Sequence, residues 1–146
     1  MKNRSGNPFY TAIAAIMLAA VFATTAAAHH SFAMYDQTKA TTLTGKLTRY
    51  ITGANHAQLI FQLLDETGKP VQWGVETGSA ASMARNGVAP ATFPEGTVFT
   101  VTLHPLRDGR TFGAMSGALI QCGTAMPQGG CTEKTGKVLV RGNADI

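Results

Sequence analysis

The sequence is poor in charged residues, which make up 14% of its 146 positions. Its formal net charge is only +4, and its lysines and arginines are scattered singly rather than clustered in a run. A nucleic-acid groove needs clustered cations, commonly interleaved with aromatic side chains on which bases stack. We therefore expect no nucleic-acid partner.

The common catalytic motifs are also missing. The sequence contains no Gly-x-Ser-x-Gly elbow, no glycine loop of the kind that cradles phosphate and no His-Glu-x-x-His pair. The first of these motifs marks a serine nucleophile, the second a nucleotide site and the third a zinc peptidase. The sequence therefore favours a binding protein over an enzyme.

Cysteine is scarce, with Cys122 and Cys131 as the two examples. The eight residues between them include the turn formers Pro127, Gly129 and Gly130. In an oxidising compartment such a pair usually forms a disulfide, which is the pairing we expect. A thiolate metal site or a redox pair is the alternative, although the sequence has no Cys-x-x-Cys motif to favour it.

The first 28 residues have the features of a secretory signal peptide. Lys2 and Arg4 precede an alanine-rich apolar stretch over residues 9–23, and Ala26 to Ala28 supply the small residues that signal peptidase requires. The apolar stretch is shorter than the roughly 20 residues that span a membrane. We expect cleavage after Ala28, a periplasmic or secreted protein, and no membrane span in the mature form. A retained anchor is the alternative.

Hydrophobic residues after position 40 alternate with a period of two, which indicates a mainly β domain. In the first strand we expect Leu43, Leu47 and Ile51 on one face and Tyr50 on the other. The strands that the pattern predicts cover residues 41–51, 56–64, 71–76, 97–104 and 112–121, with a short sixth over 137–141. Glycines at 113 and 117 predict a bulge or tight bend in the fifth.

One helix is predicted between the third and fourth strands. Ser79 can cap residues 80–85, and Asn86-Gly87 provides a left-handed stop. This order is typical of an OB-fold, a partly open five-stranded barrel with one short helix between strands three and four. We therefore predict an N-terminal extension over residues 29–40 and an OB-like β-barrel domain over 41–146 that ends in a cysteine hairpin. A small β-sandwich is the alternative fold.

Histidine is the residue type on which a function can be built, and the chain has four. His29 and His30 would follow the signal-peptidase cut, His56 opens the second predicted strand and His104 closes the fourth. In an OB-like barrel we expect the loops beside the last two to lie at one end. Neutral imidazoles suit copper or zinc, and copper(II) leads the affinity order. We predict a metal site formed by these four residues, with copper first and zinc second.

The position of the cut determines the chelate at the N-terminus. Cleavage after Ala28 would let the α-amine and imidazole of His29 bind one ion together. Cleavage after Ala27 would give Ala28-His29-His30, in which the amine, two backbone nitrogens and the third-position imidazole form a square plane. Both need deprotonated ligands, and an α-amine with a pKa near ~8 and an imidazole near ~6.5 lose their protons readily at neutral pH.

Each histidine also has an ordinary structural interpretation. Residues behind a signal peptide often form a frayed tail, His56 can finish a turn after Asn55, and His104 can be an exposed strand residue before Pro105. Trp73 is most simply a core residue. The sequence alone leaves both interpretations of the histidines open.

Four segments resemble a family of small exported bacterial proteins of unknown function that begin Ala-His-His-Ser-Phe. They are His29 to Asp36, Trp73 to Ser79, Pro94 to Gly96 and Leu103 to Gly109. The similarity extends to about Leu119, and the chain departs from the family at Asn55-His56, where the family has Asn-Pro-His, and in the cysteine loop. The resemblance implies an exported domain without an established activity.

The sequence therefore supports two functions of different classes. The first is a periplasmic metal-binding protein that sequesters or delivers copper through its N-terminal and loop histidines. The second is a metal-free module of the cell envelope that recognises another protein or a saccharide.

Overall fold

The protein is described here from a computed structural model, which covers residues 30–53, 55–64 and 67–142. The chain divides into two units, residues 1–34 and the remainder from Tyr35 onward. The first contains the short helix α2 (His30–Ala33). The expected signal peptide and His29 lie outside the described residues, and no described helix is both long and apolar enough to cross a membrane.

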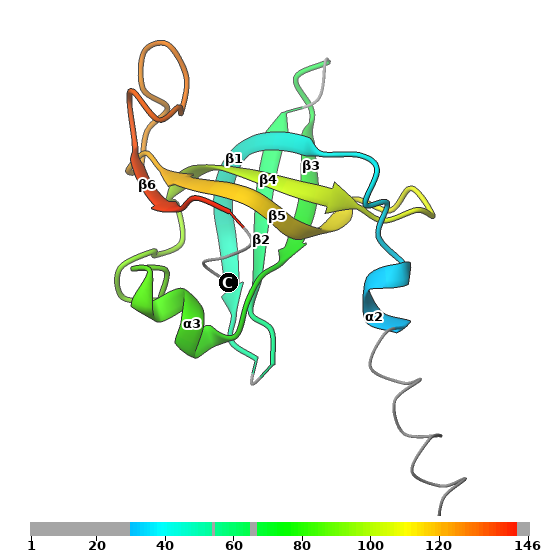
Figure 1. Cartoon of the computed structure of the whole chain (residues 1–146). Helices are drawn as coiled ribbons and strands as arrows, with labels where there is room; N and C mark the ends of the chain where they lie inside the picture. Colours follow the sequence, from blue (N-terminus) through cyan, green and yellow to red (C-terminus); the bar gives the residue numbers. More distant parts are fainter. Residues whose placement is uncertain (1–29, 54, 65–66, 143–146) are drawn as a thin grey trace, which may run out of the picture. The chain divides into compact units, whose positions relative to one another are not determined.

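The second unit is a β-barrel with one helix. Its elements in chain order are β1 (Thr41–Ile51), β2 (Gln58–Leu64), β3 (Pro70–Glu76), α3 (Ala80–Arg85), β4 (Val98–Pro105), β5 (Phe112–Gln121) and β6 (Lys137–Val140). The sheet order is β3-β2-β1-β4-β5-β6, and a parallel pairing of β3 with β5 closes the first five strands into a ring (Figure 1). The predicted OB-like barrel with its helix between β3 and β4 is confirmed.

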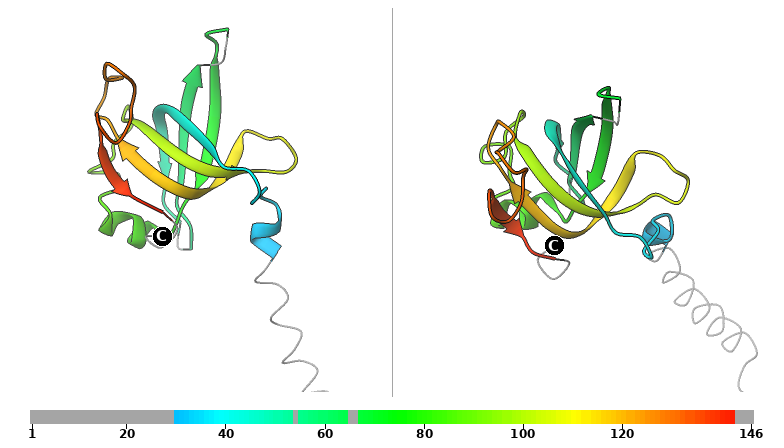
Figure 2. Two further views of the ribbon diagram at one scale, coloured as in Figure 1. Left: turned by 45° about the horizontal axis from the view of Figure 1, so that its top comes forward. Right: turned by 90° about the horizontal axis from the view of Figure 1, so that it is seen from above.

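One edge of strand β5 pairs with two different strands, β3 and β6. Its first residues, Phe112 to Ala114, pair with β3 and close the ring, while Leu119 to Gln121 pair with β6. Strand β6 therefore lies outside the ring. The loop from Cys122 to Cys131 and the β4–β5 loop project on opposite sides of the barrel (Figures 1 and 2).

The barrel interior is filled by alternate residues of the strands. Phe99 is fully buried near the centre, and its ring makes edge contacts with Phe61 at 5.0 Å and Phe93 at 5.3 Å between centroids. Helix α3 contributes Met83, which is also fully buried. A helix of six residues has little stability of its own, so this packing and its two ends hold it in place.

Both predicted ends of α3 are present. The Ser79 hydroxyl oxygen accepts a hydrogen bond from the Ser82 amide at 3.1 Å, and Gly87 adopts a φ of +82°. The amide of Val88 then donates to the Met83 carbonyl at 2.9 Å, which completes the helix end.

The predicted facing of Tyr50 is wrong. The β1–β2 register shifts between Leu47 and Arg49, as it does at a β-bulge, and the side chains that follow change face. Tyr50 consequently packs against the core, and its hydroxyl donates to the Val88 carbonyl at 3.1 Å. The predicted irregularity at Gly117 is confirmed, because the β4–β5 register shifts where Thr102 faces it, and a Cβ at Gly117 would lie 3.0 Å from the Thr102 Cβ.

Candidate functional site

His56 is held where strand β2 begins and strand β3 ends. The Ala57 amide donates to the Gly78 carbonyl and the Thr77 amide donates to the Ala57 carbonyl, both at 2.9 Å. These bonds extend the β2–β3 ladder beyond its last strand pair and fix the backbone on both sides of the imidazole. The ring then places Nδ1 3.0 Å from the Thr77 carbonyl and 3.5 Å from Glu76 Oε1.

Glu76 connects His56 to the start of the folded unit. The hydroxyl of Tyr35 donates to Glu76 Oε2 at 2.9 Å. Tyr35 is 3% exposed and packs with Leu106 and Ala114. Burial, followed by the hydrogen bond to Glu76, raises the pKa of Tyr35 well above its ordinary value. Tyr35 therefore remains a protonated donor at any physiological pH.

His104 lies on the outer face at the end of β4. Its Nδ1 is 2.6 Å from the carbonyl oxygen of Lys39. The neighbouring strand comes close at this point because it carries Gly113, where a Cβ would lie 2.6 Å from the His104 carbonyl oxygen. The glycine thus allows β5 to pair with β4 beside His104.

His56 and His104 are related through the closure of the barrel. The two histidines lie near opposite ends of β1. Thr41, at its start, pairs with Leu103, which precedes His104, and Ile51, at its end, pairs with Gln58, which follows His56 closely. Across the closure His104 pairs with Ala114, which pairs with Glu76. His104 and Glu76 are therefore two strand spacings, about 10 Å, apart.

The surface between His104 and Glu76, the neighbour of His56, is covered by another side chain. Tyr35 packs against Ala114, which lies between His104 and Glu76 in the row of paired strand residues. In the part of the chain that the structure describes, no three residues among histidine, cysteine, aspartate and glutamate form a group that could hold a metal ion. The described strands do not bring His56 and His104 to one centre. Of the other two predicted ligands, His29 lies outside the described residues and His30 is described only as the first backbone position of α2.

His56 and His104 share one chemical feature. Each has Nδ1 at hydrogen-bonding distance from a backbone carbonyl, and a carbonyl can only accept. The Nδ1 atom must therefore carry the proton, and in the neutral ring the lone pair lies on Nε2. Metal-binding histidines usually have this arrangement, because a carbonyl or carboxylate at one nitrogen orients the other toward the ion.

The predicted disulfide between Cys122 and Cys131 is present, and neither cysteine is free. Cys131 is buried against Val98 and Ile120. The alternative of a thiolate metal site is therefore wrong for the structure described here.

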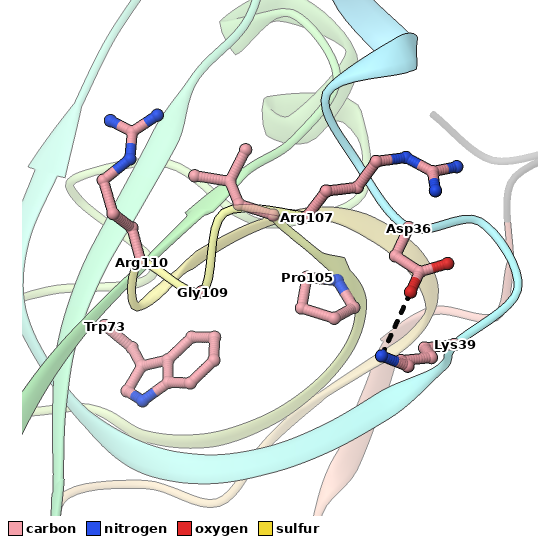
Figure 3. Close-up of a pocket in the computed structure, with 8 residues that line it drawn as sticks. Asp36, Lys39, Trp73, Pro105, Arg107, Gly109 and Arg110 are labelled. Carbon is pink, nitrogen blue, oxygen red and sulfur yellow. Dashed lines mark ion pairs between the residues drawn. The ribbon is translucent and has the colours of Figure 1, made fainter.

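A cavity lies between the start of the folded unit and the β4–β5 loop. Its volume is about 400 Å³, and its lining comprises Asp36, Lys39, Trp73, Pro105, Leu106, Arg107, Gly109 and Arg110 (Figure 3). Trp73 is not simply a core residue, since it packs against the core and also lines this cavity. The sequence signal that could have located the cavity is the pair of arginines, Arg107 and Arg110, in the turn between β4 and β5.

The carboxylates at this cavity are paired. Asp36 accepts from the Thr38 hydroxyl at 2.6 Å and lies 3.2 Å from Lys39 Nζ, and these contacts, the first above all, lower its pKa to about 2. In the loop, the Arg110 amide and guanidinium donate to Asp108 at 3.1 and 2.8 Å and lower the pKa of that carboxyl. Both groups are ionised at neutral pH.

No curated protein and no solved structure matches the chain. A family model does match it over residues 17–115, a range that includes β1 to β4 and the two strand-end histidines, His56 and His104. The chain therefore belongs to DUF6152, a family of unknown function.

Proposed function

We propose that the protein binds transition metal ions, with His29, His30, His56 and His104 as ligands that are not required to share one ion, and that it sequesters or delivers copper in the periplasm after export. Zinc is the second candidate ion. The observation that carries the proposal is the shared contact of His56 and His104, in which a backbone carbonyl at Nδ1 leaves Nε2 with the lone pair.

The surroundings of His56 add to this support. Glu76 lies 3.5 Å from Nδ1, so a carboxylate stands beside the nitrogen that faces away from a bound ion. A negative charge at this position makes the imidazole a stronger ligand. Glu76 is itself fixed by the Tyr35 hydroxyl, which limits its freedom to turn away.

The N-terminal histidines add ligands by a different route. Signal cleavage next to His29 would create an α-amine beside an imidazole, and an amine with nitrogen ligands favours copper(II). Folding of the barrel is not needed for this chelate. The number of copper ions bound per chain decides whether the N-terminal and strand histidines hold one ion or several.

The test starts from protein secreted by its host, whose intact mass fixes the N-terminus. Titration with copper(II), followed by electron paramagnetic resonance, should show nitrogen coupling. The informative variants are His56→Asn and His104→Asn. An asparagine amide can still donate to the Thr77 or Lys39 carbonyl, but it lacks Nε2. Gln62→Asn, an exposed position of β2, is the matched control.

We expect the histidine variants to lower copper affinity by more than tenfold and the control to leave it unchanged. Glu76→Gln should lower the affinity by roughly tenfold, the effect typical of a group that orients a ligand. Copper binding that persists unchanged after acetylation of the α-amine and substitution of both strand histidines would disprove the proposal. The metal-free binding module would then be the better function.

A further inference from the structure

The segment from Tyr35 to Lys39 joins the surroundings of the two strand-end histidines. At its start the Tyr35 hydroxyl donates to Glu76 at 2.9 Å, and the same carboxylate lies 3.5 Å from Nδ1 of His56. At its end the Lys39 carbonyl lies 2.6 Å from Nδ1 of His104. One segment therefore contacts His104 directly and is connected to His56 through a single carboxylate.

Internal contacts centred on Asp36 make this segment compact. The Asp36 carbonyl accepts from the Lys39 amide at 3.0 Å. The Asp36 carboxylate accepts from the Thr38 hydroxyl at 2.6 Å and lies 3.2 Å from Lys39 Nζ. Because these contacts connect the first half of the segment to its last residue, we expect it to leave the barrel as one body rather than residue by residue.

Contacts with β4 and β5 attach the segment to the barrel. The Asp36 amide donates to the Pro105 carbonyl at 2.8 Å, and the buried Tyr35 ring packs against Leu106 and Ala114. The two bonds on the histidine side add to these contacts. Each of those two bonds therefore contributes to keeping the segment closed.

An ion bound to either histidine would act on this segment. A partner at Nδ1 makes Nε2 a stronger ligand, and linkage requires that an ion at Nε2 strengthens the contact at Nδ1 in return. For His104 that contact is the Lys39 carbonyl itself. For His56 it includes the carboxylate that accepts from the Tyr35 hydroxyl. An ion at either histidine would thus favour the closed segment.

We infer that the segment from Tyr35 to Lys39 opens and closes as one unit, and that it couples the two histidines so that an ion at one raises the affinity of the other. Closing the segment has a cost in conformational entropy, and the first ion to bind would leave less of it for the second. The coupling rests on the proposed function, whereas the opening of the segment as one unit can be tested without metal.

Amide hydrogen exchange of the metal-free secreted chain tests the unit. The readout is the Lys39 amide, at the end of the segment beside His104. Tyr35→Phe removes the bond to Glu76 at the far end but keeps the buried ring, and we expect exchange at Lys39 to accelerate about fivefold to tenfold. His104→Ala should accelerate it by a similar factor, and the two factors should multiply in the double variant.

Tyr50→Phe is the matched control, because it removes a tyrosine hydroxyl bond to a different part of the barrel, the Val88 carbonyl. Exchange at Lys39 should be unchanged in this control, and exchange at Cys122, whose amide bonds to β4, should be unchanged in every variant. Unchanged Lys39 exchange in Tyr35→Phe would show that the two ends move independently and would overturn the inference. Equal acceleration at Cys122 would overturn it as well, because the whole barrel would then be responding.

Zinc, the second candidate ion, is diamagnetic and measures the coupling by the same exchange. In His104→Asn, which keeps a donor to the Lys39 carbonyl, zinc at His56 should slow Lys39 exchange about fivefold or more. Addition of Tyr35→Phe should abolish this slowing. The chain with both strand histidines replaced by asparagine gives the effect of zinc at the N-terminal pair alone.

The two possible failures are distinguishable. Zinc that bound His56 without slowing exchange at Lys39 would overturn the coupling, while the proposed function would stand. Absence of zinc and copper binding in every chain would instead contradict the proposed function and the coupling with it, and the metal-free exchange would still decide whether the segment is one unit.

Discussion

Two irregular segments are held against the barrel in different ways. We call residues 35–39 the N-terminal strap and residues 122–131 the cysteine loop. Each buries one anchor residue, Tyr35 at 3% exposure in the strap and Cys131 at 4% in the loop. The strap is then fixed by hydrogen bonds and an ion pair, whereas the loop is closed by a covalent bond.

The difference shows which segment can be linked to binding. The contacts of the cysteine loop are with β4 and β5, such as the Thr100 hydroxyl of β4 that donates to the Cys131 carbonyl at 2.6 Å. The strap instead contacts both candidate sites. Tyr35 bonds Glu76 beside His56, the Lys39 carbonyl holds His104, and Asp36 lines the cavity. Changes in the strap are therefore expected to reach the candidate sites, and changes in the cysteine loop are not.

The largest effect on stability is expected from the cysteine loop. Replacement of both Cys122 and Cys131 by serine should lower the free energy of unfolding by roughly 2 to 3 kcal/mol, because a loop of this size gains that much chain entropy in the unfolded state. Urea denaturation measures the loss, and wild-type protein treated with a reductant should show the same loss. Copper binding by the folded variant should not change, and a tenfold change in copper affinity would contradict the separation of the two segments.

A smaller effect is expected from the anchor of the strap. Tyr35→Phe keeps the buried ring but removes the donor to Glu76, and it should lower the free energy of unfolding by about 1 to 2 kcal/mol. The matched control is Tyr50→Phe, which removes a bond to the uncharged Val88 carbonyl and should cost about 1 kcal/mol or less.

Tyr35→Phe also tests whether the strap can loosen independently of the cysteine loop. Amide hydrogen exchange should accelerate at Asp36, whose amide donates to the Pro105 carbonyl at 2.8 Å, while exchange at Cys122 stays as in the wild type. Equal acceleration at both amides would mean that the variant loosens the whole barrel rather than the strap.

The smallest effect on stability is expected from protonation of Asp36 at low pH. The pKa of Asp36 is lowered to about 2 from an ordinary value of 3.8, so its ionised form is favoured in the folded state. Its stabilising contribution is complete above about pH 4 and is lost as the pH falls toward 2. Asp36→Asn should therefore be less stable than wild type at pH 7, and the difference should disappear near pH 2. Urea midpoints across this range measure it, and a difference that grew on acidification would refute the assignment.

The sequence predicted the elements well because their signals are local. Alternation located β1 and β5 at their observed bounds, and Ser79 with Gly87 located both ends of α3. The predicted facing of Tyr50 failed because the bulge after Leu47 depends on how β1 pairs with β2. A pattern within one strand carries no information about that pairing.

The candidate sites were less predictable because they depend on the closure of the ring. Tyr35 and Glu76 are 41 residues apart, and their contact follows from the way the strap crosses β5. Similarly, Trp73 alternates like a core residue, yet β5 begins its pairing with β3 only at Gly74 and leaves the indole beside an opening. Histidine identity was visible in the sequence, but the carbonyl at each Nδ1 was not.

The sharing of β5 between two partners also shortens the free edges of the sheet. With β3 on the first part of β5 and β6 on the last, the two outermost strands of the described sheet keep as free edges only residues 70–73 of β3 and the outer side of β6. Pro70 lacks an amide hydrogen and Lys137 places a charge at the start of β6. Edges this short, proline-bearing and charged are poor templates for strand addition, so the barrel is expected to resist edge-to-edge aggregation even when concentrated.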